Sequence, residues 1–131
     1  MSQENVEIVR AAYDAFNRGD WDAMFRDMHP DFELTFQHAP NPGPHRGRKE
    51  VQARIEDGVA ALDAVIYELE ELRESGEQVV ALIKFRARPK GTTAEIENRV
   101  GHVWTLRDGK VVSIHGFPKR GQALEAARLR E

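Results

Sequence analysis

Residues 78–117 read QVVALIKFRARPKGTTAEIENRVGHVWTLRDGKVVSIHGF, and this segment contains three runs rich in β-branched and aromatic residues. Turn residues separate the runs at 89–92 and at Asp108-Gly109. Successive side chains of a strand point to opposite faces, so the pairing of these runs decides which side chains meet. The segment predicts three strands joined as consecutive hairpins, at 78–88, 93–106 and 110–117.

Charge suggests a register for the first hairpin. A register in which Arg86 faces Glu95 forms opposite-charge pairs across the strands, each contributing about 0.2–1 kcal/mol. The same register places Val79 opposite His102 and separates a charged face from an apolar face. Two polar side chains, those of Asn98 and His102, then lie on the apolar face.

The second turn allows two registers. A two-residue turn pairs Trp104 with Ser113, whereas a turn with a glycine bulge pairs Trp104 with Val112. The bulged turn is preferred because it keeps Val112 on the apolar face. It also directs His115 away from His102.

Helices precede this meander. The strict alternation at 31–38 predicts a strand with Phe36 and His38 on one face, and the proline-rich segment at 39–46 predicts a loop. Apolar spacing, caps and breakers predict the other elements: helices at about 2–17, 20–28, 48–62 and 121–130, and a further strand at 64–74. Helices followed by an antiparallel meander indicate the α+β class, with a strongly curved antiparallel sheet wrapped over the N-terminal helices.

The composition limits the possible functions. The 131 residues suit a single domain, with 40% hydrophobic and 31% charged residues. The absence of cysteine excludes disulfides, thiol nucleophiles and thiolate zinc sites. A net charge of −3 gives no reason to expect nucleic acid or an anionic membrane as partner. We expect a cytoplasmic domain, because no signal peptide or spanning segment is evident, and we expect neither cofactor nor metal.

The predicted concave face resembles a small-molecule site, because a few polar groups converge on an apolar surface. Tyr13, on the apolar stripe of the first helix, can point its hydroxyl into the same space. The candidate site residues are His38 and His102 as catalytic groups, with Tyr13, Phe36, Asn98 and Trp104 as binding groups.

Each candidate also has a structural interpretation. His38 is a general base or a histidine satisfied by a loop carbonyl, and His102 polarises a substrate or bonds Asn98 or Tyr13. Asn98 donates to a substrate carbonyl or pairs with the backbone. Tyr13 and Trp104 can be core residues. His45, which lies between prolines and a helix, is expected at the surface.

Four motifs carry a family resemblance: YDAFNRGD at 13–20, HPDFE at 29–33, PHRGR at 44–48 and HVWTLRDGKVV at 102–112. In these motifs and their order, the chain resembles the SnoaL-like proteins of the nuclear transport factor 2-like superfamily. The resemblance implies a cystatin-like cone or barrel with a deep pocket, in a homodimer. It also implies that the base position of the related ketosteroid isomerases falls on His38, their oxyanion acid near His102 and their tyrosine on Ala12.

The superfamily contains both enzymes and non-catalytic proteins, so three functions remain open. The first is a cofactor-independent isomerase, cyclase or lyase in which His38 is the acid or base and His102 polarises an oxygen. The second is a binding protein for an apolar small molecule. The third is a partner-binding homodimer, with the second subunit on the convex face carrying Val103, Thr105 and His115.

Overall fold

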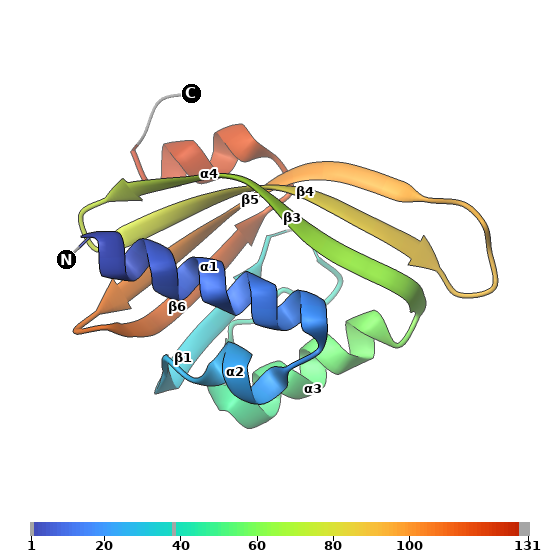
Figure 1. Ribbon diagram of the computed structural model, residues 1–131, viewed down its shortest axis with the longest axis horizontal. Helices are drawn as coiled ribbons and strands as arrows, with labels where there is room; N and C mark the ends of the chain where they lie inside the picture. Colours follow the sequence, from blue (N-terminus) through green and yellow to red (C-terminus); the bar gives the residue numbers. More distant parts are fainter. Residues whose placement is uncertain (1, 38, 129–131) are drawn as a thin grey trace.

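The computed structural model describes residues 2–37 and 39–128. Figure 1 shows helices packed against a single twisted sheet. The elements are α1 Ser2–Arg18, α2 Trp21–Phe25, β1 Met28–Phe36, β2 His45–Arg46, α3 Gly47–Val59, β3 Leu62–Ser75, β4 Gln78–Pro89, β5 Ile96–Arg107, β6 Lys110–Phe117 and α4 Arg120–Ala126. The predicted α+β class is confirmed.

The sheet has six strands in the order β2-β1-β6-β5-β4-β3. The predicted meander β3–β6 is antiparallel throughout, but β1 pairs with β6 in parallel, so the sheet is mixed rather than wholly antiparallel. Because β2 and β3 remain as edges, the sheet is not closed into a barrel. Register shifts within β3 and near the end of β5 are the kind of irregularity that bends strands.

The register of the first hairpin differs by two residues from the prediction. Arg86 pairs with Glu97 rather than Glu95, and Val79 pairs with Trp104 rather than His102. The reason is the connection, which runs from residue 90 to residue 95 and is longer than the assumed four-residue turn. A shift of two preserves the alternation, so the predicted faces are correct although the predicted partners are wrong.

The second turn contains two residues, Asp108 and Gly109, both with positive φ, as type I′ hairpins require. A register shift two residues into the strands then pairs Trp104 with Ile114, which neither predicted register gives. His115 pairs with Val103, not with His102. It lies on the face opposite His102, as the preferred register predicts.

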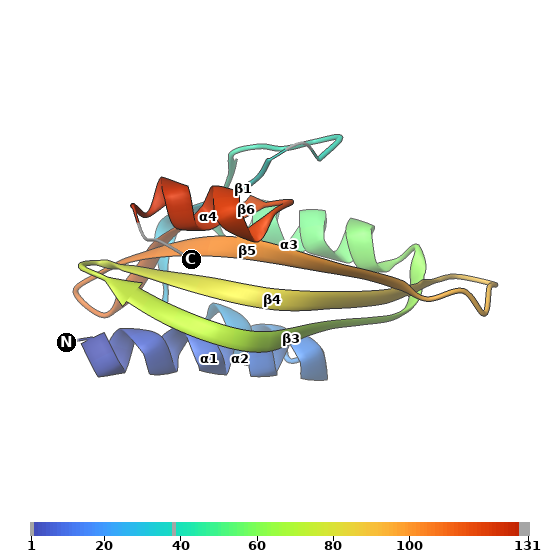
Figure 2. The same ribbon diagram turned by 90° about the horizontal axis from the view of Figure 1, so that it is seen from above.

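The sheet packs on both faces. The larger core fills the concave side and contains Phe32, Ile83 and Leu106, all nearly inaccessible to solvent. On the opposite face, α4 covers Val80, Leu82 and Val103. Figure 2 shows α4 on the side of the sheet away from α1 and α2. Helices therefore cover both faces rather than one. Val103 is buried by its own chain, which corrects its placement on a surface free for a second subunit.

Candidate functional site

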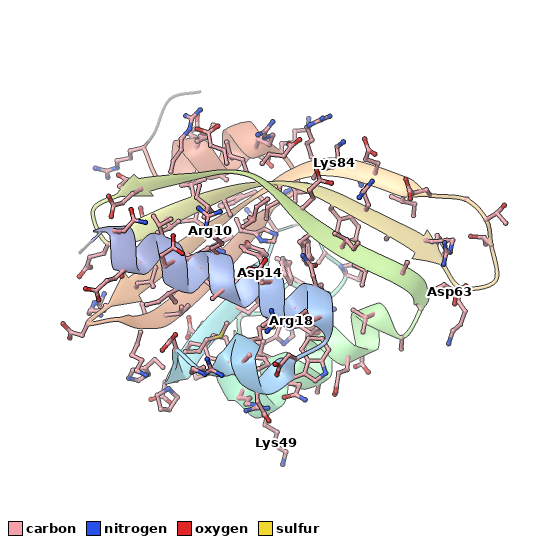
Figure 3. All side chains as sticks on the ribbon, in the orientation of Figure 1. Arg10, Asp14, Arg18, Lys49, Asp63 and Lys84 are labelled. Atoms are coloured by element: carbon pink, nitrogen blue, oxygen red, sulfur yellow. The ribbon has the colours of Figure 1, made fainter. Side chains whose placement is uncertain are left out.

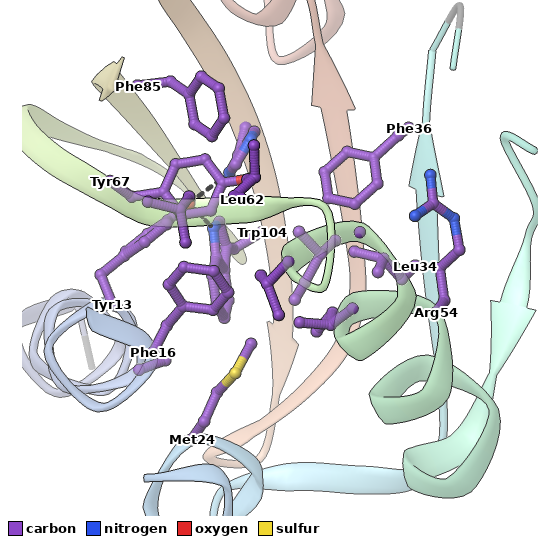
Figure 4. Close-up of a pocket in the computed structure, with 17 residues that line it drawn as sticks. Tyr13, Phe16, Met24, Leu34, Phe36, Arg54, Leu62, Tyr67, Phe85 and Trp104 are labelled. Atoms are coloured by element: carbon purple, nitrogen blue, oxygen red, sulfur yellow. Dashed lines mark hydrogen bonds between the residues drawn. The ribbon is translucent and has the colours of Figure 1, made fainter. Parts of the chain in front are cut away.

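A cavity of about 180 Å³ lies between the concave face of the sheet and helices α1, α2 and α3. This main cavity is mostly apolar, and Figure 4 shows the side chains around it. Its apolar lining includes Phe16, Met24, Leu34, Ile55, Val59 and Leu62. Polar atoms enter only from Tyr13, Arg54, Tyr67, His102 and Trp104 among the described lining residues. The cavity therefore has the apolar lining and few polar groups of a small-molecule site.

Three of these polar side chains form a hydrogen-bonded group, named here the buried polar cluster: Tyr13, His102 and Trp104. Trp104 Nε1–H donates to the Tyr13 hydroxyl oxygen at 2.8 Å, and that oxygen lies 2.6 Å from His102 Nδ1. Dashed lines mark both bonds in Figure 4. All three residues are at most 5% exposed, so these bonds satisfy groups that are costly to leave unpaired.

The cluster determines which nitrogen of His102 carries the proton. The Tyr13 hydroxyl accepts from Trp104, and in the described part of the chain its own proton has no acceptor except His102 Nδ1. Tyr13 therefore donates to Nδ1, which leaves the His102 proton on Nε2.

Burial keeps the whole cluster uncharged near neutral pH. Desolvation lowers the pKa of His102 to about 4, because an imidazolium ion is poorly solvated there. Desolvation also raises the pKa of Tyr13 well above its usual value, with the bond from Trp104 opposing the change. His102 is thus a neutral hydrogen-bond donor and a poor general base at pH 7.

His102 separates the main cavity from a second, more open hollow of about 240 Å³, named here the outer cavity. Both are lined by His102, Phe36, Tyr67 and Phe85. Gly116 faces His102 in the register, and a Cβ at this glycine would overlap the Phe36 ring and lie 3.2 Å from His102 Cδ2. No hydrogen-bond partner of His102 Nε2 is found within residues 2–37 and 39–128. The Nε2–H group is therefore a donor without an acceptor among the described residues, and it borders both cavities.

The predicted site residues separate into three groups. Tyr13, Phe36, His102 and Trp104 all line the main cavity. Asn98 is exposed and lines only the outer cavity, so the structure does not bring it to the main one. His38 lies outside the described residues.

Among the polar side chains that line the main cavity, sequence reasoning missed two, Arg54 and Tyr67. Arg54 directly precedes Ile55, an apolar residue of α3, and both side chains line the cavity. Tyr67 lies in β3, and alternation in that strand could have assigned its face. The aromatic rings of Tyr13, Phe85 and His102 surround it, with centroids 5.2–6.0 Å away.

His45 corrects another expectation, because it is 6% exposed rather than a surface residue. Its Nε2 lies 3.0 Å from the Asn41 carbonyl oxygen and its Nδ1 lies 3.3 Å from Glu50 Oε2. These contacts tie the proline-rich loop to the first turn of α3. The role of His45 is to position that loop.

Charge is distributed unevenly between the surface and the main cavity. The labelled side chains of Lys49 and Asp63 project outward in Figure 3, and both are exposed. In the main cavity, none of the described lining residues is an aspartate or glutamate. The lining therefore offers hydrogen-bond donors and one cation to a ligand, and no carboxylate.

None of the helices in the described ranges combines the length and the apolar character needed to cross a bilayer.

Comparison with known proteins gives the family. A nuclear transport factor 2-like protein of unknown function from Burkholderia pseudomallei superposes with a TM-score of 0.82 at 25% identity, covering 95% of this chain and 97% of that one. One from Burkholderia thailandensis gives 0.79 at 26% identity, covering 96% and 98%. TerC, co-crystallised with polyporic acid, gives 0.81 at 21% identity, covering 95% and 98%.

No curated protein matches the chain at a significant level. The model of the SnoaL-like domain matches residues 9–114, which include the second half of α1, all of β1 and α3, and most of the sheet. The chain therefore belongs to the SnoaL-like family.

Proposed function

We propose that this protein binds a small apolar molecule in the main cavity and donates a hydrogen bond from His102 Nε2–H to a carbonyl oxygen of that molecule. The observation that carries the proposal is the state of His102, which is neutral, held by Tyr13 and without a protein acceptor for Nε2 among the described residues. The Nε2–H group borders both cavities, so a ligand there can supply the acceptor that the described residues do not.

The apolar walls would supply most of the binding free energy, and the donor would orient the ligand. The small molecule in the TerC crystals supports a ligand-binding use of this fold, although an identity of 21% carries no ligand from TerC to this chain. The hydrogen-bond donor selects carbonyl compounds over hydrocarbons of the same shape.

A second candidate is a cofactor-independent isomerase, cyclase or lyase acting on such a carbonyl compound. A hydrogen bond to the carbonyl oxygen stabilises negative charge that develops there when a neighbouring carbon loses a proton. His102 suits this role but not that of the base, because its pKa is about 4. The base would be His38, two residues beyond Phe36 in the sequence.

The test compares 1-tetralone with tetralin, which share a ring system but differ in the carbonyl group. We expect the wild type to bind tetralone about three- to tenfold more tightly, the range that one hydrogen bond supplies. His102→Phe should abolish this preference while tetralin still binds. Calorimetric titration of both ligands measures the ratio.

The matched control is His115→Phe, because His115 lies on the opposite face of the sheet and lines neither cavity. It should keep the preference for tetralone. Equal tetralone and tetralin affinities in the wild type would contradict the role of His102. If the wild type turns over a carbonyl substrate and His38→Ala does not, the protein is an enzyme rather than a binding protein without catalytic activity.

We propose also that the chain forms a homodimer through the part of the outer face of β3–β5 that α4 leaves uncovered. This face carries both signs of charge, in pairs such as Arg86–Glu68 at 3.3 Å and Arg99–Glu70 at 3.2 Å. A surface with adjacent rows of both signs can pair with a rotated copy of itself. Light scattering at micromolar concentration should give twice the chain mass of 14.9 kDa, and the monomer mass would overturn the proposal.

A further inference from the structure

Arg54 is the one charged side chain among the described residues that line the main cavity. It belongs to α3, and its neighbours Ile55 and Gly58 line the same cavity. Figure 4 shows Arg54 and Tyr67 approaching the cavity from opposite sides, one from α3 and the other from β3. A cation that borders an apolar cavity can pair with an anionic group of a ligand bound there.

The described residues provide few contacts to the Arg54 guanidinium. Arg54 forms no ion pair with any described residue, whereas Arg46, Arg48 and Arg99 each pair with a carboxylate. Its one hydrogen bond to a described residue is long, from Nε to the Asn41 carbonyl oxygen at 3.5 Å. No described residue bonds the two terminal nitrogens of the guanidinium, which can therefore pair with a ligand in the planar geometry that suits a carboxylate.

Tyr67 provides a second donor to the same space. Its hydroxyl has no hydrogen-bond partner within the described ranges, although its ring is enclosed by aromatic neighbours. Desolvation raises the pKa of Tyr67 to about 12, and the charge of Arg54 acts in the opposite direction. The hydroxyl is therefore protonated at neutral pH and can donate to a ligand in the main cavity, which Arg54 also lines.

We infer that Arg54 and the Tyr67 hydroxyl form an anion subsite, and that the ligand of the main cavity carries a carboxylate on an apolar ring system. This inference rests on the proposed binding function and adds the charge of the ligand to it. The guanidinium pairs with the carboxylate, Tyr67 donates to it, and the apolar lining encloses the rings. No carboxylate of the described lining competes for Arg54.

The test uses 2-naphthoate and its neutral analogue 2-naphthamide, which differ mainly in charge. By calorimetric titration at pH 7 and low salt, we expect the wild type to bind the carboxylate at least tenfold more tightly than the amide, since hydrogen bonds to charged groups are the stronger ones. Arg54→Gln should remove this preference and leave the affinity for the amide unchanged. Tyr67→Phe should reduce the preference by a smaller factor.

Arg88→Gln is the matched control, because Arg88 is exposed, lies outside both cavities and forms no ion pair with a described residue. It should retain the full preference for 2-naphthoate. A preference that survives in Arg54→Gln, or a wild type that binds both probes equally, overturns the anion subsite and leaves the proposed function standing. Failure of the wild type to bind either probe overturns both.

Discussion

Tyr13→Phe is expected to lower the free energy of unfolding by about 2–4 kcal/mol, because it leaves two buried polar groups without partners. Trp104 Nε1–H loses its acceptor, and His102 Nδ1 loses its donor. The ring remains, so the apolar packing around position 13 is preserved. The loss therefore measures the hydrogen bonds of the buried polar cluster rather than a cavity.

Urea unfolding followed by circular dichroism measures this loss, with Tyr67→Phe as the matched control. Both substitutions remove a single hydroxyl from a tyrosine lining the main cavity, but the Tyr67 hydroxyl has no protein partner among the described residues. Tyr67→Phe should therefore change stability by no more than about 0.5 kcal/mol. Equal effects of the two substitutions would refute the energetic role assigned to the cluster.

The same variant tests the tautomer of His102. In the wild type, the imidazole ¹⁵N chemical shifts should identify a protonated Nε2 and an unprotonated Nδ1. Without the Tyr13 hydroxyl, Nδ1 has no donor to hold it, and the proton can occupy either nitrogen. Tyr13 is in this sense a positioning residue, since it acts on a ligand through His102.

Local periodicity was sufficient to find most of this cluster. His102 and Trp104 are two residues apart in a strand, so they share a face whichever residues they pair with. Tyr13 lies on the apolar stripe of α1, and that stripe packs against the sheet. The face of each residue depends only on its own element, which is why the sequence predicts it.

Partners across elements depend on loops, and these were predicted less well. The connection 90–95 shifted the first hairpin by two residues, and a register shift near Thr105 moved Trp104 opposite Ile114. As a result of the first shift, Asn98 pairs with Phe85. No local sequence pattern specifies the length of a connection or the position of a register shift within a strand.

Long-range pairing was the hardest part to predict. Alternation in β1 identified its apolar face but not β6 as its parallel neighbour, which is distant in sequence. For the same reason, nothing local placed α4 over Val103. Arg54 was missed because a cation next to an apolar stripe normally reaches solvent, and only the cavity beside α3 gives it another interpretation.

Acidification should destabilise the protein through His102. Its pKa is about 4 in the folded protein and 6.5 in the reference state, so the unfolded chain binds more protons between these values. The stability contributed by neutral His102 is complete above pH 6.5 and is lost progressively as the pH falls from 6.5 to 4. The expected loss attributable to this residue is about 2 kcal/mol between pH 7 and 5, and about 3 kcal/mol by pH 4.

Urea titrations of wild type and His102→Gln across this pH range isolate the effect, because glutamine retains an acceptor for Tyr13 but does not titrate. As the pH is lowered, the free energy of unfolding of the wild type should fall more steeply than that of His102→Gln. The difference between the two curves is the contribution of His102. His115→Gln is the control: burial lowers the pKa of His115 as well, but its partial exposure weakens that effect. Parallel curves for wild type and His102→Gln would mean that His102 accepts a proton in the folded state, and its role as a permanently neutral donor would be wrong.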